Sequence, residues 1–314
     1  MVNRRLIRIK AFKVLFSAVS SGDASIAEVE KNLVQSCTET LNLYYLMMNL
    51  AVALKGVADA KINIGLSKLN PTEQEKNPNR KFSENSFSKY LMENAEFSKF
   101  CEKNGLVWRD ELLGFVKKLY NTISEREYFT KYMESPEHSV KEDCKLFAKI
   151  YREELEDNED LETILEDLST TYNDDLSFVL GVILRNLDLF KKDGTLPAPK
   201  VFLKEDDREF AIELIRTSFH NYRRLYQLVK SNVDNWDSDR VVSTDMVLIT
   251  MGIAEAITFP TIPVKVTMNE YVEISKYYST INSKVFVNGL LNKIIKNMLS
   301  TGEIVKSGRG LVEN

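Results

Sequence analysis

The spacing of apolar residues along this chain is helical over most of its length. Near the N-terminus one apolar stripe repeats at intervals of four, three and four residues, and it consists of Ile7, Ala11, Val14 and Ala18. Such spacing places side chains on one face of a helix. Only 12 Gly and 7 Pro occur in 314 residues, so few positions interrupt these patterns. The chain is therefore predicted to be all-α.

The apolar patterns predict a series of helices separated by polar or proline-containing breaks. Residues 67–81 form a polar linker, and Gly194, Pro197 and Pro199 mark the clearest boundary. Residues 25–64 form either one helix or two helices broken near Thr38. The other predicted helices cover residues of about 3–20, 82–104, 108–133, 140–155, 174–190, 205–220, 222–233, 239–257, 264–278 and 283–299.

Charge is distributed unevenly, although the net charge of −4 is small. Because the first acidic residue is Asp23, the basic N-terminus can bind a polyanion locally. Residues 153–167 carry nine acids, which fit a patch for a basic partner or, as we favour, a solvated helix face and loop. The cations before Asp23 are Arg4, Arg5, Arg8, Lys10 and Lys13.

Composition narrows the class of protein. A hydrophobic fraction of 44% and a charged fraction of 28% suit a soluble chain with a substantial core. Cys37, Cys101 and Cys144 are too widely spaced for a disulfide framework or a close metal-binding pair. No signal peptide is evident, and the longest apolar run, residues 44–54, is too short to span a bilayer. We expect a cytoplasmic protein with no membrane association, no metal and no cofactor.

A second stripe on the first predicted helix combines cationic and aromatic side chains, which suggests a binding role. Arg5, Arg8, Phe12 and Phe16 fall at i, i+3, i+7 and i+11. Guanidinium groups contact phosphates and aromatic faces stack on unpaired bases, which suits single-stranded RNA. The alternative is that the phenylalanines complete the core while the arginines face water.

The turn before the last predicted helix offers a second set of candidates: Tyr277, Tyr278, Ser279, Asn282, Ser283, Lys284 and Phe286. Asn282 or Ser283 can cap that helix. Free N–H groups at the start of the helix can bind a phosphate, and Lys284 adds positive charge. Phe286 is either a stacking residue or part of the core.

Three segments carry a resemblance to a known family. Residues 3–16 read Asn-Arg-Arg-Leu-Ile-Arg-Ile-Lys-Ala-Phe-Lys-Val-Leu-Phe, residues 262–270 read Ile-Pro-Val-Lys-Val-Thr-Met-Asn-Glu, and residues 284–293 read Lys-Val-Phe-Val-Asn-Gly-Leu-Leu-Asn-Lys. They resemble the arginine-rich first helix, the Pro-x-x-x-x-Ile-Asn-Glu segment and the Lys-Phe-Val-Asn-Gly-x-Leu-Asp-Lys signature of the NusB family of transcription antitermination factors. Met268 replaces the Ile of the second motif, and Val285 looks inserted in the third.

The resemblance implies an all-helical RNA-binding bundle whose first helix lies near the last turn. It adds Arg4 to the candidates, and the expected RNA-binding residues are Arg4, Arg5, Arg8, Phe12, Phe16, Tyr278, Asn282, Ser283, Lys284 and Phe286. Changing Arg5 and Arg8 to alanine is predicted to weaken RNA binding several-fold without unfolding the protein. Gly289 is expected at a close helix crossing, and Asn269, Glu270 and Asn288 are expected to mark the fold through buried hydrogen bonds.

The chain departs from the family in length, since typical members are about half as long. We therefore expect a NusB-like helical bundle with a large inserted or expanded helical subdomain. The predicted parts are an arginine-rich first helix at 1–20, an expanded subdomain at 21–200, a C-terminal NusB-like bundle at 201–301 and a flexible tail at 302–314.

The implied function is that of an RNA-binding transcription antitermination factor. Its expected partners are a single-stranded boxA-like leader RNA, a NusE-type small ribosomal protein and the RNA polymerase elongation complex. The alternative is a helical adaptor that keeps the NusB fold but binds little RNA. An enzyme is not expected, because His138 and His220 lack ligand-type spacing and no Gly-rich nucleotide loop follows a strand.

Overall fold

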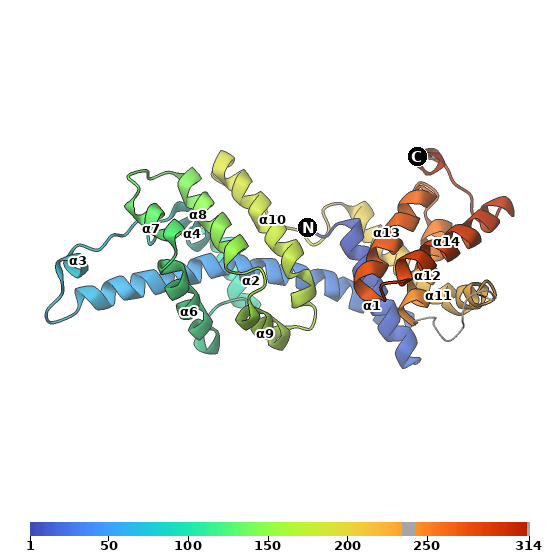
Figure 1. Ribbon diagram of the computed structural model, residues 1–314, viewed down its shortest axis with the longest axis horizontal. Helices are drawn as coiled ribbons and strands as arrows, with labels where there is room; N and C mark the ends of the chain where they lie inside the picture. The colour runs from blue at the N-terminus through green and yellow to red at the C-terminus, as the bar shows by residue number, and fades with distance from the viewer. Residues whose placement is uncertain (234–242, 313–314) are drawn as a thin grey trace. The chain divides into compact units, whose positions relative to one another are not determined.

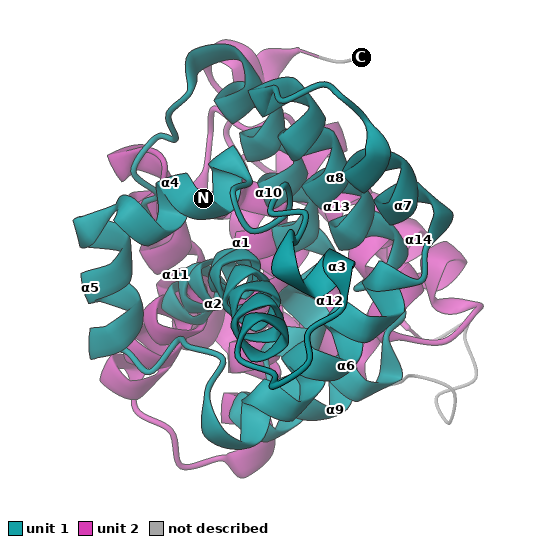
Figure 2. Ribbon diagram, turned by 90° about the vertical axis from the view of Figure 1, so that its left-hand side faces the viewer, with its two compact units in different colours: residues 1, 38–201 teal, residues 2–37, 202–314 magenta. Residues whose placement is uncertain are grey.

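The computed structural model describes residues 1–233 and 243–312. The chain divides into two compact units (Figure 2): unit 1 contains Met1 and residues 38–201, and unit 2 contains residues 2–37 and 202–314. Within the described residues the regular structure is α-helix and short 3-10 helix, with one isolated bridge between Val2 and Phe202 (Figure 1). The prediction of an all-α protein is confirmed.

Unit 1 is built on the long helix α2 (Ile26–Leu66), which has no break near Thr38 and which contributes residues 26–37 to unit 2. The predicted helix at 82–104 divides at Asn94, whose side chain accepts a hydrogen bond from the Phe97 N–H at 3.0 Å. The other elements are α3 (Glu73–Lys76), α4 (Ser86–Glu93), α5 (Ala95–Lys103), η1 (Asp110–Leu112), α6 (Leu113–Ser124), α7 (Glu127–Glu134), α8 (Val140–Glu153), α9 (Glu159–Leu168) and α10 (Tyr172–Asp193).

The apolar middle of α2 lies in the core of unit 1. Two buried aromatic side chains hydrogen-bond to its backbone. Trp108 Nε1 donates to the Leu46 carbonyl at 2.8 Å, and the Tyr151 hydroxyl donates to the Met47 carbonyl at 2.9 Å. Among the described helices, α2 alone is long and apolar enough to cross a membrane, but 61% of its most apolar window is buried. A core helix satisfies the same criterion, so this is weak support for a membrane span.

The acid-rich segment forms helix α9, which the sequence patterns did not predict. Asn158 caps it by accepting a hydrogen bond from the Leu161 N–H at 3.0 Å, and Leu161 and Leu165 are fully buried. Most of the acids of this segment are exposed, in agreement with the solvated-face interpretation. Glu154 is the buried exception, because Arg126 binds both of its carboxylate oxygens, at 2.8 and 2.9 Å.

Unit 2 packs around one almost wholly buried helix, α12 (Ser243–Thr258), which contacts α1, α11, α13 and α14. The predicted helices at 205–220 and 222–233 form a single helix, α11, and residues 239–242 of the next prediction lie outside the described residues. The other elements of unit 2 are α1 (Arg4–Ser21), α11 (Glu205–Lys230), α13 (Val264–Tyr278), α14 (Ser283–Ser300) and η3 (Gly308–Leu311).

The close helix approach in unit 2 occurs at Gly252 of α12, not at Gly289. A Cβ at Gly252 would lie 2.8 Å from Leu291 Cδ2 and 3.2 Å from Tyr271 Cδ2, whereas one at Gly289 would meet nothing within 4 Å. Gly289 is exposed, so its predicted packing role is wrong.

The two glycines are therefore expected to respond to substitution with opposite signs. Gly289→Ala should raise the free energy of unfolding by about 1 kcal/mol, because glycine in a helix interior is unfavourable. Gly252→Ala should lower it by about 1 kcal/mol, because overpacking outweighs the same gain in helix propensity. Urea denaturation of both variants measures this, and a stabilising Gly252→Ala would contradict the packing described.

The segment after α14 docks on the end of α12, where the sequence predicted a frayed tail. Ile304 is buried, and Lys306 Nζ donates to the carbonyls of Ala256 and Phe259 at 2.8 and 3.0 Å. The Ser307 N–H donates to the Pro260 carbonyl at 3.0 Å. These donors satisfy carbonyls at or just after the C-terminus of α12 that lack helical partners.

Candidate nucleic-acid interface

Helix α1 holds the N-terminal candidates and has well-defined ends. Asn3 caps it, with its side-chain oxygen accepting from the Leu6 N–H at 2.9 Å. Gly22, at φ 79°, ends it with an N–H donated to the Ala18 carbonyl at 3.2 Å. The predicted helix at 3–20 is thus confirmed, and the buried stripe of Ile7, Ala11 and Ala18 fixes which side chains face outward.

Arg8 does not lie on the surface. Its Nε and Nη2 atoms lie 2.7 and 2.8 Å from the two carboxylate oxygens of Glu255, and the side chains are 4% and 0% exposed. Thr267 and Tyr271 donate their hydroxyls to the same carboxylate at 2.8 and 3.1 Å. Burial lowers the pKa of Arg8, but the bond to Glu255 and its charge outweigh that effect and the pKa is raised overall. The expectation that Arg8 contacts RNA is therefore corrected.

Arg4 and Arg5 remain accessible at the start of α1, with side chains 43% and 55% exposed. Arg5 nevertheless binds Glu270 through two hydrogen bonds of 2.9 and 2.8 Å, which lower the pKa of that carboxyl. Arg4 Nε lies 3.3 Å from Asp207 Oδ1, and its guanidinium lies 4.9 Å from the centroid of the Phe210 ring. A phosphate at either arginine would have to compete with a carboxylate.

Aromatic rings join the middle of α1 to the end of α13. The centroids of Phe12 and Tyr278 lie 5.7 Å apart, and those of Phe12 and Phe16 lie 6.2 Å apart. Lys13 Nζ lies 5.0 Å from the centroid of the Tyr278 ring. Phe12 is buried at 3%, whereas Phe16 and Tyr278 are partly exposed. The structure thus brings together residues that are more than 260 positions apart in the chain.

The turn before α14 is organised internally. Ser283 is buried; its hydroxyl donates to Asp245 Oδ2 at 2.7 Å and accepts from the Thr280 N–H at 3.1 Å. Asn282 occupies the N-cap position of α14 without a capping hydrogen bond from its side chain. Phe286 is 8% exposed and belongs to the core. Ser283 and Phe286 are therefore corrected to structural roles, as Phe12 is, while Asn282 and Lys284 stay exposed.

We define the α1–α13 surface as the accessible residues of α1, of the end of α13 and of the turn before α14. Sequence reasoning overlooked Lys13 as a contact, although it lies in the basic N-terminal run. Tyr277, which the sequence offered at the turn before α14, is 81% exposed. Exposed Ile281 and Val285 add an apolar border. The polar and aromatic members of the surface are Arg4, Arg5, Lys13, Phe16, Tyr277, Tyr278, Asn282 and Lys284.

The signature asparagines do not form the buried hydrogen bonds that the sequence suggested. Asn269 and Asn288 are exposed, and both line a groove between α13 and α14. Glu270 instead carries the ion pair with Arg5. The interpretation of Asn269 and Asn288 as buried fold markers is wrong, because the interior at this level is filled by apolar side chains of α12, α13 and α14.

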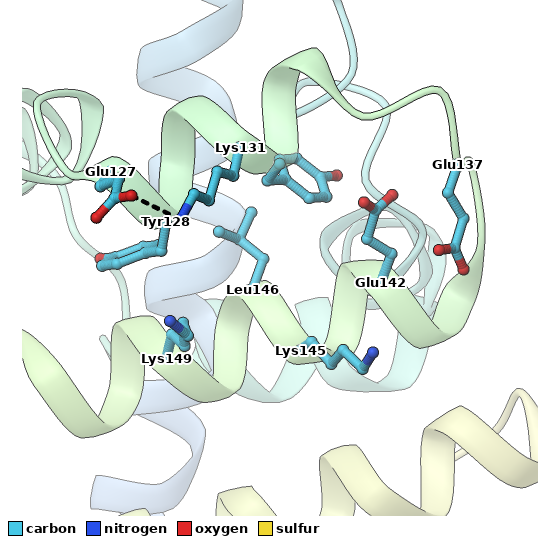
Figure 3. A pocket seen from close by; sticks show the side chains of 9 residues that line it. Glu127, Tyr128, Lys131, Glu137, Glu142, Lys145, Leu146 and Lys149 are labelled. Atoms are coloured by element: carbon cyan, nitrogen blue, oxygen red, sulfur yellow. Dashed lines mark ion pairs between the residues drawn. The ribbon is translucent and has the colours of Figure 1, made fainter.

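A groove of about 310 Å³ in unit 1 lies between α7 and α8 and is a rival candidate for an anion site (Figure 3). Three lysines and three glutamates line it, and Lys131 is paired with Glu127 at 2.6 Å. Opposite charges balance in this groove, so it does not favour a polyanion. In the part of the chain that the structure describes, no group of three His, Cys, Asp or Glu side chains could hold a metal ion.

These features define unit 2 as an all-helical bundle in which a basic first helix packs on α11 and α12 and meets the end of α13 through the rings of Phe12 and Tyr278. A model of the NusB family matches residues 195–296. The chain belongs to the NusB family of transcription antitermination proteins. This class of factor is not enzymatic, although the chain extends well beyond the matched segment.

Three relatives named "Transcription antitermination protein NusB" support the assignment. The protein from Salinibacter ruber is 35% identical over 115 residues, which are 36% of this chain and 72% of the relative. Those from Chloroherpeton thalassium and Thermodesulfovibrio yellowstonii are 36% and 34% identical over 106 and 91 residues, covering 34% and 29% of this chain and 50% and 60% of the relatives. No solved structure matches the chain.

Proposed function

We propose that this chain is a cytoplasmic antitermination factor that binds a single-stranded, boxA-like leader RNA through the α1–α13 surface. The observation that carries the proposal is the contact of Phe12 with Phe16 and Tyr278, beside Lys13, where α1 meets the end of α13. Accessible rings next to cations fit unpaired bases joined by phosphates. Lys284, exposed at the start of α14, offers a further phosphate contact through its ammonium group.

Protein partners extend this proposal. By its family, the chain would act with a NusE-type small ribosomal protein on the RNA polymerase elongation complex. We assign residues 1–20 and 201–301 to the NusB-type bundle and residues 21–200 to the expanded helical subdomain, of which residues 21–37 belong to unit 2. We assign residues 302–314 to a C-terminal segment, of which residues 304–307 dock on the end of α12.

Filter binding with a short unstructured boxA-like RNA tests the proposal. For about four neutralised phosphates, the slope of log affinity against log salt should be near −3. Neutralising Lys13 and Lys284 with Lys13→Gln and Lys284→Gln should lower affinity about tenfold and reduce the slope by about 1.4. Lys265→Gln with Lys296→Gln is the matched control, since both lysines are exposed in the same unit but line the groove between α13 and α14.

A helical protein–protein adaptor is the second candidate. It is favoured by the ion pairs that occupy Arg4, Arg5 and Arg8, because these bonds leave less free charge for RNA than the sequence suggested. Absence of salt-sensitive RNA binding, or equal loss of affinity in the two lysine double variants, would favour the adaptor.

A further inference from the structure

The groove between α13 and α14 has a volume of about 640 Å³, and residues 310–312 form part of its wall. This volume is within the usual range of binding sites, about 300–1,000 Å³. Its polar lining is distinctive, since three asparagines from two helices converge on it: Asn269, Asn288 and Asn292. None of the three side chains hydrogen-bonds to another residue of the described chain.

The spacing of these amides matches an extended peptide. Asn288 and Asn292 lie one turn apart on α14, about 6 Å along its axis. Two residues of an extended chain span about 6.6 Å. Peptide groups two residues apart, which face the same side of that chain, could therefore hydrogen-bond to the side chains of Asn288 and Asn292. An asparagine side chain offers both a donor and an acceptor, which is what a peptide N–H and C=O require. Asn269 faces the same groove from α13.

Charge in the groove points to an acidic occupant. Exposed Lys265 and Lys296 line it, and none of its lining residues is acidic. Lys296 follows Asn292 by four residues, so the amide row on α14 ends in an ammonium group. Met268, Ile295 and Leu311 supply apolar contacts between the polar groups.

We propose that this groove binds an extended acidic segment of a partner protein through its asparagine amides and flanking lysines. A helical segment fits less well, because its backbone groups are bonded internally and would leave the amides without partners. RNA also fits less well, because no aromatic residue lines the groove to stack on a base. The inference deepens the proposed function, on which it rests for its biological purpose, by assigning a face to a protein partner.

Fluorescence anisotropy of the full chain with a labelled, end-capped octapeptide of alternating leucine and glutamate tests the groove. The acidic peptide should bind saturably, and Asn288→Ala with Asn292→Ala should weaken binding about tenfold. Asn297→Ala is the matched control, because Asn297 is exposed on the same helix but does not line the groove, and it should leave affinity unchanged. A leucine–lysine octapeptide should bind at least about tenfold more weakly than the acidic one.

Three results would overturn the inference: no saturable binding of the acidic peptide up to millimolar concentration, equal affinity of the double variant and the unchanged protein, or equal binding of the lysine peptide. All substituted side chains are at least partly exposed, and circular dichroism verifies that the variants fold. RNA binding is measured in a separate titration without peptide. Failure of the groove and failure of the RNA surface are therefore distinct results.

Discussion

Replacing Arg8 with alanine is expected to lower the free energy of unfolding by about 3–5 kcal/mol, because it leaves Glu255 buried without its charge partner. The pair is inaccessible, with side chains 4% and 0% exposed, and Arg8 binds both carboxylate oxygens. Thr267 and Tyr271 also donate to this carboxylate, so it cannot turn toward water without breaking their bonds. Urea denaturation followed by circular dichroism measures the loss.

Arg5→Ala is the matched control on the same helix. Its bidentate bond to Glu270 is exposed to solvent, and such pairs contribute at most about 1 kcal/mol. A loss in Arg8→Ala no larger than that in Arg5→Ala would show that Glu255 is not isolated from water. The burial of the Arg8–Glu255 pair argues against the expectation that Arg5 and Arg8 can be changed together without unfolding, so Arg8 is unsuitable for testing RNA contact.

Removing the accessible rings of the α1–α13 surface is expected to have the largest effect on RNA binding. Phe16→Ala with Tyr278→Ala should weaken affinity for a boxA-like RNA on the order of thirtyfold, because each base stacked on an aromatic ring contributes about 1–3 kcal/mol. Filter binding at fixed salt measures the change. The slope against salt should stay near that of the unchanged protein, since no cation is removed.

Conservative changes at the same positions separate stacking from packing. Phe16→Tyr and Tyr278→Phe keep the rings and should retain affinity within about twofold. Because Tyr278 also packs against Phe12, the free energy of unfolding of each alanine variant is measured alongside. If the folded double-alanine variant keeps full RNA affinity, the rings of Phe16 and Tyr278 do not contact the RNA.

Much of the bundle was predictable because local patterns determine helices. The stripe of Ile7, Ala11 and Ala18 gave α1, and the prolines at 260 and 263 separated α12 from α13. The predicted helix boundaries were wrong where a side-chain cap determines where a helix begins or ends. Asn94 ends one helix and starts another, and Asn158 starts α9, yet single asparagines within polar stretches are weak signals.

The candidate site was predictable in its location but not in its chemistry. Sequence motifs indicated that α1 and the turn before α14 belong to one region, and the rings of Phe12 and Tyr278 do meet there. Arg5 and Arg8 are only three residues apart, yet one is exposed and the other buried. That difference depends on Glu255, which lies on a helix distant in sequence.

By itself, the sequence determined the helical class, the family and the basic, aromatic character of the first helix, because these follow from residue periodicity and from motifs read along the chain. Only the tertiary structure decided which charges are available, which glycine meets a neighbouring helix and which asparagines face a groove. Each of those outcomes depends on side chains brought together from distant positions, and burial changes the energy of a charge or an amide far more than its neighbours in sequence do.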